Sequence, residues 1–365
     1  MGDVRTVTSE GEKDPHVEPE VKQYCFLKPR KVVRSAGDGS TRCHRDARPA
    51  FHNAKRLLKL EVMDGVLLPS NAFNVDNLTD ALRYKPLPRD IFIATYPKAG
   101  TTWTQYIVWA LLNLDNNEEP LPSLKRINYD LMPFLEFAGR KAVEKLPEPR
   151  VIKHHLVFSK SPYHPEAKYL AIVRNPFDCV VSFYHHCLDD RANLEMAEDA
   201  TFDDFFEDFM DGHVPFGDYF ELVLSWYAHR RDPNVLFYYY EKLIDNPKEG
   251  YLKIADFIDK SIGEKLRADE ALLAAVVRKT SFKNLKTSVM ISHDDEDSVK
   301  EEKGDEEVFA PFRNFFRKGV VGGWRSYLKA EQERKLREVY EKHIRGTEMW
   351  DVWKTHVDID NTHAS

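Results

Sequence analysis

The sequence predicts an α/β fold, a single domain in which a central, mainly parallel sheet is flanked by helices. Short apolar runs of strand length alternate along the chain with longer runs that repeat apolar residues at helical spacing. Polar and basic residues follow several of these strands directly, and ligands in such folds bind beyond the carboxyl ends of the strands. The chain has 365 residues, 42% of them hydrophobic, which is enough for one large core.

The alternation begins at about residue 57, and each expected element has a local reason. Buried strands are expected where short runs combine apolar, β-branched and aromatic residues: 90–95, 151–156, 169–173 and 235–240. Residues 101–114 repeat apolar side chains at helical spacing, which predicts the first helix.

Two later helices are also expected. One begins after Asn175, a good N-cap residue, with Pro176 at its first position and Asp178 in its first turn. The other runs from about Ala330 and places Leu336 and related apolar residues on one face. We therefore expect the domain to span 56–350, between a flexible polar tail over 1–55 and a C-terminal tail over 351–365.

Composition excludes several classes of protein. The net charge is −7, and the stretch 294–307 alone holds nine acidic residues against two lysines. A broad basic face, as a polyanion-binding protein needs, is not visible. No apolar run reaches the roughly 18 residues that cross a bilayer, and the N-terminus lacks a secretory signal. The four cysteines show no metal-ligand spacing, so we expect a cytoplasmic protein without a metal.

The first strand-end motif is Thr95-Tyr-Pro-Lys-Ala-Gly-Thr-Thr-Trp103. Gly100 permits a close backbone approach, and the helix that follows offers N–H groups and a dipole that favour an anion. Lys98 adds a full positive charge. The motif is typical of a phosphate cradle, although Lys98 precedes the glycine, so it is not a Walker A loop. Alone, it is equally compatible with a tight turn carrying a solvated lysine.

The second motif is Lys153-His154-His155. Side chains alternate along a strand, so Lys153 and His155 share one face and His154 points the other way. A cation beside an imidazole suits charge stabilisation combined with proton removal.

Two further motifs suit anions. Arg174 ends a strand, and Ser182 lies on the following helix, so a guanidinium and a hydroxyl are available to a phosphate. The run Arg317-Lys-Gly-Val-Val-Gly-Gly-Trp324 joins two cations to a flexible glycine. A salt bridge and a surface turn are the plain alternatives, but four anion-suited sites, three of them at strand ends, together favour an anion-binding site.

These motifs resemble those of the cytosolic sulfotransferases that use 3′-phosphoadenosine 5′-phosphosulfate (PAPS). The resemblance covers about residues 60–345 and rests on five runs in matching order: TYPKAGTTW, K-x-H-L at 153–156, R-N-P…S at 174–182, Thr280-Ser-Phe282 and RKGVVGGW. It implies a sulfotransferase that transfers a sulfuryl group directly to a hydroxyl of a small molecule, such as a phenol, an alcohol or a catecholamine-like acceptor.

The resemblance also implies a role for each motif. His155 would be the general base, assisted by Lys98 and Lys153. The 5′-phosphosulfate would lie against the P-loop-like segment Lys98, Ala99, Gly100, Thr101 and Thr102. The 3′-phosphate would be bound by Arg174, Ser182, Arg317, Lys318 and Gly319. Adenine would stack between Trp103 and Phe282, with Tyr240 and Thr280 at its edge. The product would be adenosine 3′,5′-bisphosphate, and no metal would take part.

Other features of the family are absent or uncertain here. The usual dimerisation pattern is not recognisable in 325–334, so a homodimer formed by that route is doubtful. In the family the interval 282–316 forms a lid over the acceptor pocket, and the acidic stretch within it is either a solvated loop or a feature that favours cationic amines. Aromatic residues expected near the acceptor are Phe134, Phe137, Phe158, Phe183 and Tyr184.

Rival interpretations remain at this point. A nucleoside-triphosphate hydrolase would need a Walker lysine and an acidic magnesium site, and neither is found. A nucleotide-binding protein without catalysis would not need both Lys98 and His155. A dehydratase that uses the same nucleotide would be distinguished by the mass of its product. A Golgi carbohydrate sulfotransferase would need a membrane anchor.

Overall fold

The computed structural model describes residues 57–287 and 319–357. The predicted N-terminal tail and the acidic stretch 294–307 lie outside these residues, as do Arg317 and Lys318. The strands are β1 (Leu60–Met63), β2 (Val66–Pro69), β3 (Ile91–Thr95), β4 (Val151–His154), β5 (Lys168–Val173) and β6 (Val235–Tyr239). The four strands predicted from apolar runs are β3 to β6.

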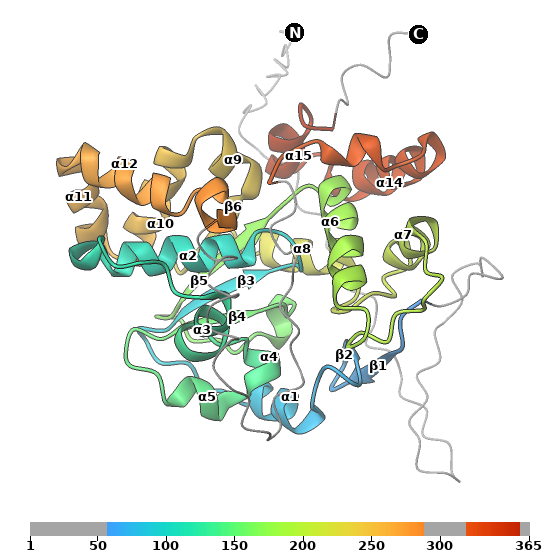
Figure 1. Ribbon diagram of the computed structural model, residues 1–365, viewed down its shortest axis with the longest axis horizontal. Coiled ribbons are helices and arrows are strands. Elements are labelled where there is room, and N and C mark those ends of the chain that lie inside the picture. Colours follow the sequence, from blue (N-terminus) through green and yellow to red (C-terminus); the bar gives the residue numbers. More distant parts are fainter. Residues whose placement is uncertain (1–56, 288–318, 358–365) are drawn as a thin grey trace, which may run out of the picture. The chain divides into compact units, whose positions relative to one another are not determined.

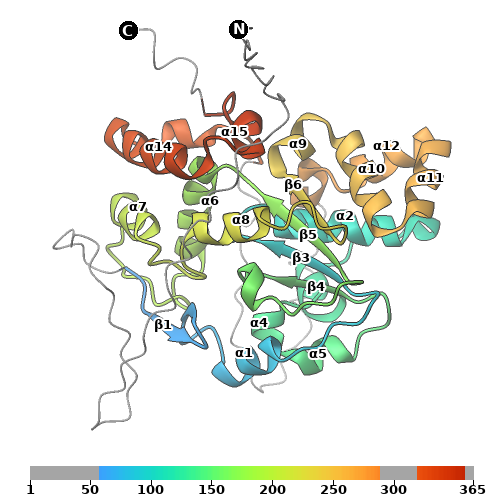
Figure 2. The ribbon, with the colours of Figure 1, turned by 180° about the vertical axis from the view of Figure 1, so that it is seen from behind.

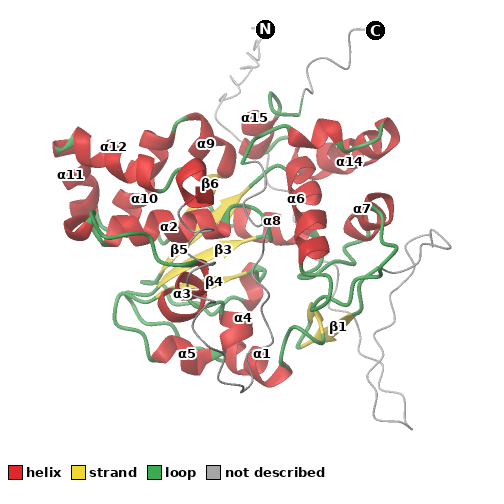
Figure 3. Ribbon diagram, viewed as in Figure 1, coloured by secondary structure: helices red, strands yellow, loops and turns green. Residues whose placement is uncertain are grey.

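The helices surround the strands (Figure 3). They are α1 (Val75–Leu82), α2 (Thr101–Leu112), α3 (Leu124–Arg126), α4 (Leu135–Ala138), α5 (Arg140–Glu144), α6 (Pro176–Asp189), α7 (Phe202–Met210), α8 (Tyr219–Tyr227), α9 (Tyr240–Asp245), α10 (Pro247–Ile258), α11 (Lys260–Ala268), α12 (Glu270–Lys279), α14 (Ala330–Ile344) and α15 (Glu348–Trp353). Short helical turns are η1 (Leu114–Asn116), η2 (Ile127–Leu131), η3 (Phe158–Lys160) and η4 (Gly323–Ser326).

The central sheet has the strand order β4-β3-β5-β6, and all of its pairings are parallel. In register, Ala94 of β3 lies opposite His154 of β4 and Ala171 of β5. β1 and β2 form a separate antiparallel hairpin. Because the central strands are parallel, their carboxyl ends lie along one edge, where the predicted motifs should meet.

Alternation along the strands divides the core into two parts. Phe92 and Ala94 pack with residues of α6, α8, α14 and α15, whereas Ile91 and Ile93 pack with residues of α2 and α10–α12. Figure 1 shows α10, α11 and α12 gathered on one side of the sheet and α6, α14 and α15 on the other. Figure 2 shows the same arrangement from behind, with α8 over the strands. Both faces of the sheet are therefore covered, which explains why its strands read as continuous apolar runs.

The start of α6 follows its local sequence closely. The Asn175 side chain accepts a hydrogen bond from the Asp178 backbone N–H at 2.9 Å, and Pro176 occupies the first turn. The chemistry of the cap therefore determines where this helix begins and where Arg174 lies, one residue before the cap.

The predicted end of the domain at residue 350 is too early. α15 continues to Trp353, and Trp353 and Val357 are fully buried. The indole N–H of Trp353 donates to Glu241 Oε2 at 2.8 Å. Residues 351–357 thus belong to the folded domain because they bury apolar side chains and satisfy an internal carboxylate.

Candidate active site

The loop between β3 and α2 has the backbone of an anion cradle. Lys98 and Gly100 have positive φ angles, 66° and 108°, and α2 begins without a side-chain cap. A Cβ atom added at Gly100 would lie 2.8 Å from the Tyr240 ring, so only glycine fits between helix and ring. Ala99 is buried, and Thr101 and Thr102 form the first turn of α2. The uncapped helix start favours an anionic ligand at this point.

Two cations converge on this loop. Arg174 Nη1 donates to the carbonyl of Lys98 and Nη2 to the carbonyl of Val320, each at 3.3 Å. Within the described residues, Arg174 Nε is buried and has no hydrogen-bond partner. Burial and the positive charge of Arg174 lower the pKa of Lys98 to about 8. Two positive charges in a partly dehydrated site indicate a place for an anionic group.

The end of β4 supplies the second part of the site. Lys153 Nζ donates to the amide oxygen of Asn128 at 2.6 Å and lies 4.8 Å from the centroid of the Phe134 ring. Burial lowers the pKa of Lys153 to about 8, although the carboxyl group of Glu136 opposes the shift. His154 points the other way, as predicted, and is buried between Phe92 and Trp226.

His155 is held by its Nδ1 atom. This atom lies 2.8 Å from the carbonyl oxygen of Thr95 and 3.3 Å from its hydroxyl. A carbonyl oxygen only accepts hydrogen bonds, so Nδ1 carries the proton and Nε2 is left as the basic nitrogen. Burial, followed by the charge of Lys153, lowers the pKa of His155 to about 3. The ligand-free imidazole is therefore neutral at physiological pH and able to accept a proton.

Aromatic rings surround this imidazole. Phe134 and Phe216 lie edge-on to it, with ring centroids 5.1 and 4.9 Å away. Phe73 contacts both of these rings and Phe137. Phe216 has a positive φ of 68°, a strained conformation for a non-glycine residue, and its N–H donates to the Leu67 carbonyl of the β1–β2 hairpin at 2.7 Å. The hairpin thereby helps to hold an aromatic wall beside His155.

Two of the five predicted acceptor-side aromatics lie in this wall, and three do not. Phe134 and Phe137 belong to it. Phe158 packs against Trp226 and His229 instead. Phe183 and Tyr184 both pack against Phe205 on the side of α7. These three therefore do not lie in the wall beside His155, and whether they contact the acceptor stays a prediction, since aromatic side chains also fill ordinary cores.

A second aromatic group lies at the start of α2. The Trp103 indole N–H donates to the carbonyl of Thr280 at 2.9 Å, and its ring centroid lies 5.4 Å from that of Tyr240. The guanidinium of Arg174 lies 4.5 Å from the centroid of the same Tyr240 ring. The hydroxyl of Thr280 is fully buried and engages Tyr251 and the Val276 carbonyl. Trp103 and Tyr240 thus connect the phosphate cradle to an aromatic surface.

Gly319 brings the last predicted motif to this surface. Its φ is 63°, and an added Cβ would overlap the ring of Phe282 at 2.4 Å. Asp178 holds the same loop, since its two carboxylate oxygens accept the N–H groups of Gly322 and Trp324 at 2.8 and 3.2 Å. The loop that follows Arg317 and Lys318 is therefore fixed beside Arg174. Ser182 lies half-buried on α6.

Several residues at the site were not predicted. Besides Phe73 and Phe216, these are Asn128, Glu136 and His186. His186 lies one turn after Ser182 on α6, and its pKa is lowered by burial and then by the charges of Lys98, His155 and Lys153. Helical spacing from Ser182 was the one signal in the sequence that pointed to His186.

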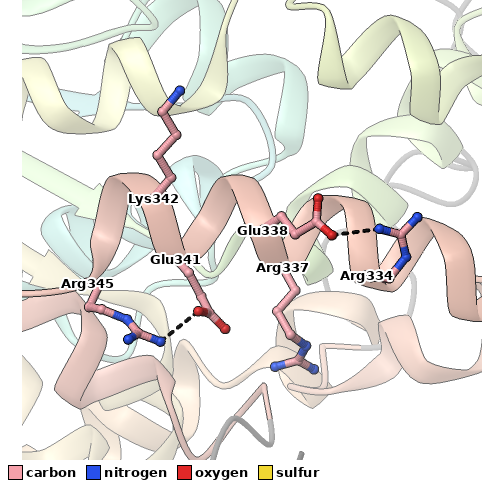
Figure 4. Close-up of a pocket in the computed structure, with 6 residues that line it drawn as sticks. All are labelled: Arg334, Arg337, Glu338, Glu341, Lys342 and Arg345. Atoms are coloured by element: carbon pink, nitrogen blue, oxygen red, sulfur yellow. Dashed lines mark hydrogen bonds and ion pairs between the residues drawn. The ribbon is translucent and has the colours of Figure 1, made fainter.

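Other features of the described residues lie apart from this site. A surface depression on α14 is lined by residues that form ion pairs along the helix, Arg334 with Glu338 and Arg345 with Glu341 (Figure 4). Over 57–287 and 319–357, no group of three or more His, Cys, Asp or Glu residues is arranged to hold a metal ion. In the same ranges, no helix has the length and apolar character needed to cross a membrane.

The arrangement is that of an α/β transferase with a nucleotide-phosphate cradle beside a histidine. The sulfotransferase domain family matches residues 88–348, so the chain belongs to the sulfotransferase family and is a sulfotransferase enzyme. Human sulfotransferase 1C2 is 30% identical over 299 residues, a match that covers 80% of this chain and 94% of the relative.

Solved structures agree with this assignment. Mouse sulfotransferase SULT7A1 complexed with PAP superimposes with a TM-score of 0.62 at 25% identity, covering 82% of this chain and 99% of that one. Retinol dehydratase in a complex with retinol and PAP gives a TM-score of 0.58 at 25% identity, covering 78% of this chain and 89% of the other. The predicted fold class and family are thereby confirmed.

Proposed function

We propose that this sulfotransferase moves a sulfuryl group from PAPS to a hydroxyl of a small aromatic acceptor, with His155 as the general base. The observation that carries the proposal is the placement of His155. Its Nδ1 is bound to the Thr95 carbonyl, its Nε2 is available as a base, and the ring stands between the cationic cradle and the aromatic wall.

The reaction is a direct in-line transfer. Nε2 of His155 takes the proton of the acceptor hydroxyl while the acceptor oxygen bonds to sulfur and the bond from sulfur to the 5′-phosphate oxygen breaks. Negative charge grows on the leaving phosphate and stays on the sulfuryl oxygens, where Lys98 and Lys153 stabilise it. Burial is the main reason for the low His155 pKa, and the charges of Lys153 and Lys98 add to it; an anionic nucleotide would offset these charges and so make the imidazole a better base.

In this proposal PAPS is the cosubstrate, and adenosine 3′,5′-bisphosphate (PAP) is its product. The cradle suits the 5′-phosphosulfate because Lys98, Thr101 and Thr102 lie at an uncapped helix start. Arg174 suits the 3′-phosphate because its Nε lacks a partner within the described residues. Trp103 and Phe282 would stack on adenine. The further 3′-phosphate contacts predicted for Ser182, Arg317, Lys318 and Gly319 remain predictions, as do the edge contacts of Tyr240 and Thr280.

The acceptor is inferred from the aromatic wall. Phe73, Phe134 and Phe216 offer flat apolar surfaces beside His155, which suit a phenol or another ring-bearing alcohol. A catecholamine-like acceptor, a cytoplasmic location and the absence of the usual dimer contact stay predictions from the sequence. The similarity to retinol dehydratase keeps dehydration of an alcohol as the second candidate.

The test combines the purified protein with PAPS and a mixed panel of phenols, monoamines, sterols and retinoids, followed by mass spectrometry. We expect wild type to form a sulfate ester, and we expect Lys98→Ala and His155→Ala to lose it. His155→Ala should still bind adenosine 3′,5′-bisphosphate, with turnover lowered by ~10²–10⁴-fold, the usual contribution of a general base. A product lighter by one water would favour the dehydratase. Full turnover by His155→Ala would contradict the assigned base.

A further inference from the structure

Glu136 is a fully buried carboxyl group directly behind the proposed base. It lies in α4, and its Oε1 accepts the backbone N–H of His155 at 2.6 Å. Within the described residues, its other oxygen is buried without a hydrogen-bond partner. Burial raises the pKa of Glu136 to about 8. A buried carboxyl group opposes folding unless its contacts compensate, which directs attention to what its hydrogen bond to His155 does.

The backbone around Glu136 explains the contact. The N–H of Lys153 donates to the Pro133 carbonyl at 3.1 Å, and Phe134 pairs with Lys153 as a short parallel bridge. The segment 133–134 thus pairs with β4 through a single parallel bridge. The chain turns into α4 at Leu135 and no longer runs beside β4. The next N–H on the same side of this strand, that of His155, therefore lacks the backbone carbonyl with which a longer strand pairing would provide it. The side chain of Glu136 supplies the acceptor that the sheet no longer provides.

This gives His155 two fixed points on different elements. Glu136 from α4 holds its main chain, and Thr95 from β3 holds its ring at Nδ1. Phe134, two residues before Glu136, packs against the same ring. Within the described residues the imidazole is hydrogen-bonded to Thr95 and not to the Glu136 carboxyl group, so Glu136 is not the acidic member of a proton relay.

We propose that Glu136 is a positioning residue, which fixes the orientation of His155 by accepting its backbone N–H. The inference rests on the proposed function, in which His155 is the general base. It deepens that function by assigning a role to a side chain that touches neither substrate nor nucleotide.

The kinetic test compares Glu136→Leu with Glu136→Gln. Glutamine keeps an acceptor oxygen at the same length, whereas leucine removes it. We expect Glu136→Leu to lower kcat by ~10²-fold, the size of effect that a misplacement near 1 Å produces, while the Kd for adenosine 3′,5′-bisphosphate stays unchanged. Glu136→Gln should recover most of the lost kcat. Should the leucine variant not fold, Glu136→Asp, whose carboxylate is one methylene short of the His155 N–H, is expected to show the same pattern.

Asp90 provides a matched control. It is also a fully buried carboxyl group that accepts a backbone N–H, that of Leu87 at 2.8 Å, but it precedes β3 at the opposite edge of the sheet. Asp90→Asn should leave kcat unchanged. An equal loss of kcat in Asp90→Asn and Glu136→Leu would overturn the proposal, because it would show a general effect of altering a buried carboxyl group.

A second readout does not depend on turnover. Protein labelled with ¹⁵N-histidine, with His155 assigned from His155→Ala, should show its ring as the Nδ1–H tautomer in wild type and in Glu136→Gln. We expect Glu136→Leu to give a mixture of tautomers. An unchanged His155 signal or unchanged kcat in that variant would overturn the positioning role. If wild type forms no sulfated product, the proposed function fails, and the tautomer signal still decides whether Glu136 positions the ring.

Discussion

Buried charged side chains have different hydrogen-bond partners at the two edges of the central sheet, the one formed by the amino ends of its strands and the one formed by their carboxyl ends. At the amino-terminal edge, Asp90 accepts hydrogen bonds from the Tyr84 hydroxyl and the Leu87 N–H, and Arg150 donates to the same Tyr84 hydroxyl at 3.3 Å. The Asp90 carboxyl group and the Arg150 guanidinium there belong to one hydrogen-bond network. At the carboxyl-terminal edge, Arg174 donates to two neutral carbonyls and Lys153 to a neutral amide. These two cations therefore form their hydrogen bonds with neutral groups, and no carboxylate among the described residues hydrogen-bonds to either of them, which favours an anionic ligand at that edge.

The comparison teaches that burial of charge does not by itself mark a functional site. Arg150 and Arg174 both lie next to the end of a strand, but their hydrogen-bond partners differ: Arg150 bonds to the Tyr84 hydroxyl, which itself bonds to the Asp90 carboxylate, whereas Arg174 bonds to the backbone carbonyls of Lys98 and Val320. The predictions that follow test whether nucleotide binding belongs to one edge alone, and they run from the largest expected effect to the smallest.

Gly100→Ala should remove nucleotide binding almost completely. The new Cβ would lie 2.8 Å from the Tyr240 ring at a φ of 108°, so both the cradle and the ring would have to move. We expect the Kd for adenosine 3′,5′-bisphosphate to rise by at least ~10²-fold, as strain of a few kcal/mol implies. Gly217→Ala is the matched control, since its φ is also positive, 80°, and no atom lies within 4 Å of its added Cβ. Equal loss in both variants would place the cause in backbone strain rather than in the cradle.

Arg174→Leu should weaken the nucleotide by ~10–10²-fold, the range for losing hydrogen bonds to a charged group. Arg150→Leu should lower the thermal midpoint and leave the nucleotide Kd unchanged, because its partner is the Tyr84–Asp90 pair. Calorimetric titration and thermal melts of both variants give the comparison. An unchanged nucleotide Kd in Arg174→Leu would contradict the distinction between the two edges.

The sequence predicted the central sheet and its strand ends because those signals are local. Apolar β-branched runs identified β3 to β6, and the Asn175-Pro176 cap identified the start of α6. Residues whose role depends on tertiary contact were missed. Glu136 on α4 and Phe216 before α8 reach His155 only through the folded structure, and neither lies in a motif. The C-terminal boundary was missed for the same reason, since Trp353 is buried through tertiary contacts with Tyr239, Tyr340 and Glu241.

The pH dependence of nucleotide binding is the smallest of the expected effects. Lys98 and Lys153 have a pKa of about 8 in the ligand-free protein, below the ordinary value of 10.5. Both lysines lose their charge as the pH rises through that value, so the anionic nucleotide should bind less tightly at higher pH. We expect the affinity to fall by roughly 10-fold between pH 7 and pH 8.5, because both lysines must be charged to bind the anion. Constant affinity between about pH 7 and pH 9.5 would contradict the lowered lysine pKa values.

The most direct test of the central claim is a calorimetric titration of wild type with adenosine 3′,5′-bisphosphate and, separately, with adenosine 5′-monophosphate. In the proposed function, Lys98 in the β3–α2 loop serves the 5′-phosphate and Arg174 after β5 serves the 3′-phosphate. The account predicts one bisphosphate per chain, bound far more tightly than the monophosphate. Equal affinity for the two nucleotides, or no binding of either, would contradict the assignment of this edge as the cosubstrate site.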